Sequence, residues 1–98
     1  MNINEMCKKC HQVAVEKGFW DEPRNNGELI ALMHSELSEA LEALRQIDES
    51  KNNVGEELAD CCIRIFDYCG ARDIDLEKEL NKKIEINKKR PKKHGKKF

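Results

Sequence analysis

The chain has 98 residues, of which 39% are hydrophobic and 38% are charged. This length suits a single domain, and the chain is too apolar and too patterned to be disordered. No apolar run approaches the roughly 20 residues of a membrane span, and the first residues lack the features of a secretory signal. We therefore expect a cytoplasmic protein with no membrane partner, in which the five cysteines are thiols.

A formal net charge of -1 conceals a sharp division of charge along the chain. Residues 1–81 carry 9 Lys/Arg and 18 Asp/Glu, whereas residues 82–98 carry 9 Lys/Arg and 1 Glu. An acidic body argues against binding of duplex DNA over the whole surface, so nucleic acid is not the expected partner. The composition predicts one domain over residues 1–91 and a basic C-terminal tail over residues 92–98.

Apolar spacing and capping residues predict four helices, over about 3–17, 27–47, 54–70 and 75–89. The expected caps are Asn2 or Asn4, Asn25 or Asn26, Asn53, and Asp73 or Asp75. Polar residues 48–52 form a short loop between the second and third helices. Short connections favour antiparallel neighbours, so the fold class is all-α: a small antiparallel bundle of about four helices.

Three glutamates on the second helix have different predicted environments. At 100° per residue, Glu36 falls inside the apolar arc of the helix, Glu39 on its margin, and Glu42 on the opposite side. Glu36 should therefore point towards the packed interior and Glu42 towards solvent. Burying a carboxylate costs several kcal/mol unless it is paired or ligates a metal.

The third helix repeats this spacing with Glu57, which flanks its apolar stripe, and Asp60, which lies farther round the helix. Two such pairs on neighbouring helices would gather up to four negative charges, and a hard divalent cation such as Mg²⁺, with Mn²⁺ as the alternative, removes the repulsion. The competing interpretation is a set of solvated acids, with Arg45 and Arg64 as salt-bridge partners. Asp60 and Arg64 have the i, i+4 spacing of such a pair.

The last helix carries a polar stripe beside its expected buried face of Leu76, Leu80 and Ile84. The stripe consists of Lys83, Asn87 and Arg90, at i, i+4 and i+7. Lysine offers a point charge and arginine a planar fork, which together suit polyphosphate. The alternative is a solvated basic helix end favoured by the helix dipole.

These features together resemble the MazG-like nucleotide pyrophosphohydrolases of the all-α NTP pyrophosphatase superfamily. The resemblance lies in Glu36-Leu37-Ser38-Glu39 and Glu57-Leu58-Ala59-Asp60, joined to the basic ending from Lys83 to Pro91. It implies hydrolysis of NTPs or dNTPs to nucleoside monophosphate and pyrophosphate in nucleotide-pool housekeeping. By the same resemblance, Mg²⁺ is held by Glu36, Glu39, Glu57 and Asp60, and phosphate is bound by Lys83, Asn87 and Arg90. Spacing does not decide which carboxylate activates water; its marginal position favours Glu39.

The resemblance also implies a homodimer or homotetramer that completes the bundle. Trp20, in the loop before the second helix, either stacks on the nucleobase or plugs a helix end. Cys7 and Cys10 have the CxxC spacing of some zinc sites, but their apolar helical positions favour core thiols. The competing function is a non-catalytic helical adaptor whose basic tail binds nucleic acid or an acidic partner.

Overall fold

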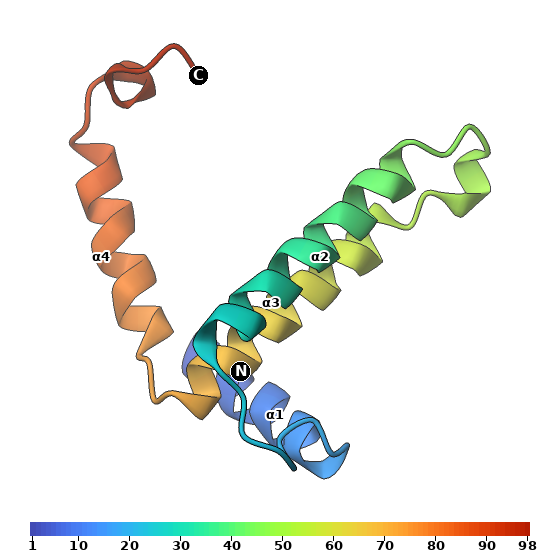
Figure 1. Cartoon of the computed structure of the whole chain (residues 1–98). Helices are drawn as coiled ribbons and strands as arrows, with labels where there is room; N and C mark the ends of the chain where they lie inside the picture. The colour runs from blue at the N-terminus through green and yellow to red at the C-terminus, as the bar shows by residue number, and fades with distance from the viewer.

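The computed structural model describes residues 1–98 and is entirely helical (Figure 1). The elements in chain order are α1 (Ile3–Glu16), α2 (Asn26–Leu44), a 3-10 turn (Glu49–Lys51), α3 (Val54–Ala71), α4 (Leu76–Lys88) and a second 3-10 turn (Lys92–Gly95). The predicted all-α bundle is confirmed. None of the helices combines the length and the apolar character needed to cross a membrane.

The starts of the helices follow from their capping residues. The side-chain oxygen of Asn2 accepts from the Glu5 amide at 2.8 Å, and that of Asn25 accepts from the Glu28 amide at 2.8 Å. One predicted boundary is wrong: α2 ends at Leu44 rather than Ile47. Ile47 is fully exposed, so no partner surface holds the last apolar positions in a helix.

The central element of the fold is α3, because both α1 and α2 pack against it. Small side chains on α2, such as Ala40 and Ala43, are buried here, and the short connection after α2 makes α2 and α3 an antiparallel arm (Figure 1). At Gly70 the backbone of α3 comes so near to Cys7 of α1 that there is no room for a Cβ atom. The buried apolar residues are Cys7, Leu29, Ala40, Ala43, Cys61 and Cys69.

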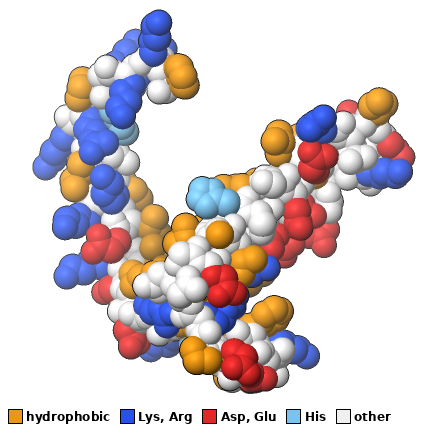
Figure 2. All heavy atoms as spheres, in the orientation of Figure 1, with side chains coloured by type: hydrophobic (Ala, Val, Ile, Leu, Met, Phe, Trp, Pro, Cys, Tyr) orange, Lys and Arg blue, Asp and Glu red, His pale blue; other side chains and the backbone are white.

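The fourth helix stands away from the arm and is held at its start by α1 (Figure 1). The Asn4 amide donates to Asp75 Oδ1 at 2.8 Å, and Asn4 Oδ1 accepts from the Glu77 amide at 3.2 Å. The expected burial of the apolar face of α4 is wrong for a single chain, because Leu80 and Ile84 are both exposed. Figure 2 shows apolar side chains on the side of α4 that faces the arm.

The single chain exposes more surface than a compact folded monomer of the same mass. Its accessible surface is 7733 Å², whereas a folded monomer of this mass exposes about 5,800 Å². Its radius of gyration is 16.1 Å, compared with about 13 Å for a compact chain of 100 residues. Only 7 of the 98 residues are buried. The helices therefore form without closing a core on every side.

Replacing Gly70 with Ala should destabilise the packing of α1 on α3. An added Cβ would lie 2.6 Å from the Cys7 carbonyl oxygen and 2.8 Å from His11 Cβ, so the two helices would have to separate. We expect a loss of about 1–3 kcal/mol in the free energy of unfolding, measured by urea titration. Gly55→Ala is the matched control, because its Cβ meets nothing within 4 Å. An equal loss in both variants would contradict this account.

Candidate functional site

Three of the predicted carboxylates converge on one edge of the α2–α3 arm. One side-chain oxygen each from Glu36, Glu39 and Glu57 lies within 4.8 Å of the other two. Glu36 is buried, Glu57 is partly buried and Glu39 is exposed, so the group reaches from the interior to solvent. Glu42 is exposed and pairs with Arg45 at 3.1 Å, as its position on the helix predicts.

The buried member of this group has a cationic partner. Arg64 Nε donates to Glu36 Oε1 at 2.8 Å across the α2–α3 contact, and the Glu36 side chain is 12% exposed. The alternative pairing of Arg64 with Asp60 does not form. The reason is that a buried carboxylate gains more from a charged partner than an exposed one does.

The other two carboxylates are incompletely neutralised. Glu57 Oε1 accepts from the side-chain amide of Asn53 at 3.0 Å, but its buried Oε2 has no hydrogen-bond partner. A protonated Glu39 could donate a hydrogen bond to Glu36 or to Glu57, whereas the ionised cluster leaves Glu57 Oε2 without a partner. The hydrogen bond to Glu36 and the charge of Glu36, followed by the same effects of Glu57, raise the pKa of Glu39 above the ordinary glutamate range. The cluster therefore resists full ionisation unless a cation joins it.

The donor set fits a hard divalent cation. Three ionised carboxylates and the Arg64 guanidinium leave a formal charge of -2, the charge that such a cation cancels. Carboxylate oxygens are preferred ligands of Mg²⁺ and Mn²⁺. The free Oε2 of Glu57 is the atom that most requires a ligand, since a buried acceptor without a partner is costly.

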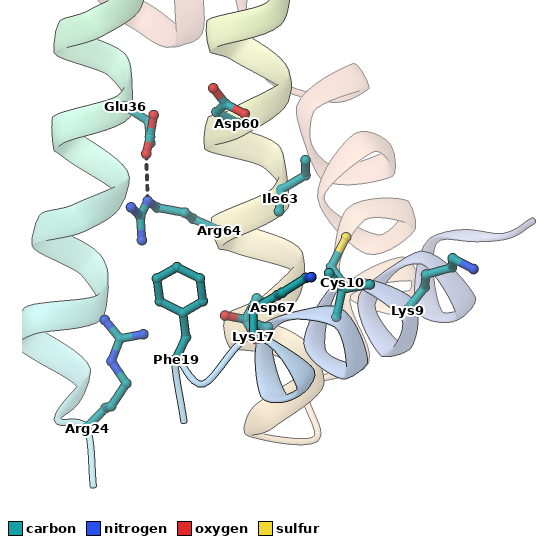
Figure 3. Close-up of a pocket in the computed structure, with 12 residues that line it drawn as sticks. Lys9, Cys10, Lys17, Phe19, Arg24, Glu36, Asp60, Ile63, Arg64 and Asp67 are labelled. Carbon is teal, nitrogen blue, oxygen red and sulfur yellow. Dashed lines mark hydrogen bonds and ion pairs between the residues drawn. The ribbon is translucent and has the colours of Figure 1, made fainter. Parts of the chain in front are cut away.

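Asp60, the fourth predicted ligand, is not part of the three-carboxylate group. It is exposed and lines a pocket together with Glu36 (Figure 3). Glu36 therefore belongs to both the group and the pocket. Asp60 reaches only the pocket.

The basic stripe of α4 is not brought to these acids within one chain. Lys83 and Asn87 are exposed on α4, which stands away from the α2–α3 arm, and Arg90 is exposed just after the end of α4. Arg90 lies 3.3 Å from His94 of the tail. Their role as phosphate ligands stays a prediction.

Trp20 occupies an internal network. Its Nε1 donates to both oxygens of Asp67, at 3.0 and 3.2 Å, and its ring packs edge-on against His11. The guanidinium carbons of Arg24 and Arg72 each lie 5.5 Å from its centroid, within the range of cation–π attraction. These contacts favour the structural interpretation of Trp20 over base stacking. They fix the loop between α1 and α2 on α3.

Two side chains of the pocket had no signal in helical spacing. Phe19 and Arg24 belong to the loop, and both line the pocket that contains Glu36 and Asp60. Phe19 was visible in the sequence only as one of two neighbouring aromatics. Arg24 follows Pro23 and could have been singled out only by knowing how the Trp20 network turns the loop back onto α2.

No family model, curated protein or solved structure matches this chain in comparisons with known proteins. The resemblance to MazG-like pyrophosphohydrolases therefore rests on the residues quoted above and stays a prediction.

Replacing Glu39 with Gln should stabilise the metal-free protein near neutral pH. The pKa of Glu39 is raised in the folded chain. Its favourable contribution to the free energy of unfolding is therefore fully present below the ordinary carboxyl pKa of about 4, and it is lost as the pH rises through the raised pKa. The melting temperature of Glu39→Gln minus that of wild type should grow from about pH 4 to about pH 7, measured in EDTA by circular dichroism. Glu42→Gln is the control. A difference independent of pH would contradict crowding of the three acids.

Proposed function

We propose that the chain is a Mg²⁺-dependent nucleoside triphosphate pyrophosphohydrolase of nucleotide-pool housekeeping. The observation that carries the proposal is the convergence of Glu36, Glu39 and Glu57, with one buried Glu57 oxygen that has no partner. The motif spacing supports the same chemistry. In this reaction one water is consumed, the anhydride bond between the α- and β-phosphates breaks, and nucleoside monophosphate and pyrophosphate are released. The cytoplasmic location stays a prediction.

The roles of the carboxylates follow from their burial. Glu36 and Glu57 would hold the cation, since Glu36 is fixed by Arg64 and Glu57 by Asn53. When bound, Mg²⁺ or Mn²⁺ supplies charge neutralisation and polarises phosphoryl oxygens. Glu39 is exposed and has a raised pKa, so it suits the group that orients the attacking water and accepts its proton.

Replacing Glu57 with Gln should lower kcat/KM for pyrophosphate release by about 100-fold or more, because the cation loses a fixed ligand. The measurement is pyrophosphate release from a panel of NTPs and dNTPs with Mg²⁺. Glu56→Gln is the matched control, since Glu56 is exposed on the adjacent position of α3. Asp60→Asn tests the fourth residue of the motif. A wild-type chain that is silent on the whole panel would refute the activity.

We further propose that a second copy covers the exposed apolar surface. The excess of about 2,000 Å² over a compact monomer matches the share of each chain in an obligate homodimer, whose interfaces bury about 2,000–5,000 Å² in total. On α2, the uncovered stripe consists of Leu37, Leu41 and Leu44. The basic residues of α4 could reach phosphate at the carboxylates only from such a copy. The same holds if the assembly is a homotetramer.

Leu41→Glu should therefore shift the chain from dimer to monomer in sedimentation velocity while the helical content stays unchanged. Leu41 is 57% exposed in the single chain, so a charge there harms only an interface. The control is Glu42→Ala, on the opposite side of α2. A monomeric wild type at micromolar concentration would overturn the proposal of a second copy.

The second candidate function is the helical adaptor, favoured by the cationic cluster in the C-terminal segment. Arg90, Lys93, His94, Lys96 and Lys97 surround one hollow that no acidic side chain lines. If this surface is the functional one, removing residues 92–98 abolishes binding to RNA or DNA and its steep salt dependence. Pyrophosphate release that survives this truncation supports the enzyme instead.

A further inference from the structure

A pocket of about 340 Å³ lies between α1, the following loop and the α2–α3 arm (Figure 3). Its size falls within the range of small-molecule sites. Glu36 and Asp60 line the end nearest the three-carboxylate group, and Cys10 and Ile63 line other walls. Because Glu36 belongs to both, a ligand in this pocket can extend directly to the carboxylates.

Four side chains follow one another along one wall, in the order Glu36, Arg64, Phe19 and Arg24 (Figure 3). Phe19 is a large aromatic residue that remains 58% exposed while it lines a pocket. Ile63 and the aliphatic residues of α1 supply further apolar surface. An accessible aromatic face of this kind suits a planar ring, because stacking on it is favourable for any nucleobase.

The two arginines on this wall retain hydrogen-bonding capacity. Arg64 uses Nε for Glu36, which leaves its two terminal nitrogens without a hydrogen bond in the chain. The Arg24 side chain is only 11% exposed, and its one ion pair is a long contact of 3.6 Å to Glu28. Lys9 and Lys17 also line the pocket and form no ion pair. Of the three acids here, Glu36 is paired with Arg64, Asp67 is engaged by His11 and Trp20, and Asp60 has no cationic partner. The four basic side chains outnumber these acids, so the pocket favours an anionic ligand.

We propose that this pocket binds the nucleoside monophosphate portion of the substrate, with its phosphate at Arg64 beside Glu36, its base against Phe19, and Arg24 donating to the edge of the base. The inference rests on the proposed function for the identity of the substrate. It assigns the base platform to Phe19 rather than Trp20. It also makes Arg64 of α3, rather than the basic side chains of α4, the protein's positive charge nearest the α-phosphate.

The position of Arg24 has a consequence for base preference. A guanidinium group only donates hydrogen bonds, and its fork matches bases that present carbonyl acceptors. Guanine, uracil, thymine and cytosine carry such oxygens. Adenine offers only ring nitrogens, and its N1 and N7 lie beside the N6 amino donor, which opposes a second N–H of the fork. The pocket therefore binds a carbonyl-bearing nucleotide more tightly than an adenine nucleotide.

The test is an NMR titration of the ¹⁵N-labelled full chain in EDTA with UMP, GMP, AMP and ribose 5-phosphate. The single tryptophan gives one indole N–H signal, and that N–H donates to Asp67 beside the pocket. UMP or GMP should bind about tenfold more tightly than ribose 5-phosphate. Phe19→Ala should remove that advantage, and Arg24→Gln should reduce the preference over AMP.

Arg45→Gln, an exposed arginine replaced in the same way, should leave each Kd unchanged. If Phe19→Ala and Arg24→Gln both keep the wild-type Kd values, the pocket proposal is wrong, even when pyrophosphate release is intact. Equal binding of AMP and UMP overturns the role of Arg24. Glu57→Gln should retain nucleotide binding in EDTA. Binding with this pattern in a wild type that hydrolyses nothing would support the pocket and refute the proposed reaction.

Discussion

The whole candidate site depends on the crowding of negative charge at the α2–α3 contact. Small side chains at Ala40 and Ala43 accompany the close packing of α2 on α3, and that packing brings Glu36 and Glu57 together from two helices. Arg64 neutralises one of these charges, and the unpartnered Glu57 oxygen shows that the chain does not neutralise the rest. A helix pair packed only for stability would place apolar groups here, because buried ion pairs rarely add net stability.

Side-chain contacts fix the loop between α1 and α2 on α3. Asp67 accepts from Trp20 and lies 2.9 Å from Nδ1 of His11, while Arg72 donates to the Arg24 carbonyl at 3.0 Å. One carboxylate of α3 thus holds both α1 and the loop in place. The same contacts position Phe19 beside Arg64, with Arg24 beyond Phe19 on the wall of the pocket (Figure 3). Trp20 therefore acts on the site indirectly, by fixing its neighbours, which is a role that its residue type alone would not suggest.

Much of the architecture was predictable because helices are local. Capping by Asn2, Asn25 and Asp75 and the apolar spacing place all four helices, and the angle of Glu36 on α2 predicts its burial. The site was predictable in part. Periodicity brings Glu36, Glu39 and Glu57 to one edge, but it does not fix the rotation of α3, which turns Asp60 towards the pocket instead. The loop residues were missed because their positions depend on contacts between residues distant in sequence, such as Trp20 with Asp67.

The direction of α4 relative to the other helices also could not be predicted from the local sequence pattern. Its apolar spacing indicates a buried face, yet spacing does not say which surface covers it. Within one chain Leu76 at the start of the helix is partly buried, and Leu80 and Ile84 are left exposed. The acidic arm and the basic C-terminal segment are consequently held apart (Figure 2). Because α4 cannot neutralise the carboxylates of its own chain, neutralisation has to come from Arg64, from a bound cation or from another copy. The charge division in the sequence therefore does not serve ion pairing between α4 and the arm, because the opposite charges do not lie against each other within one chain.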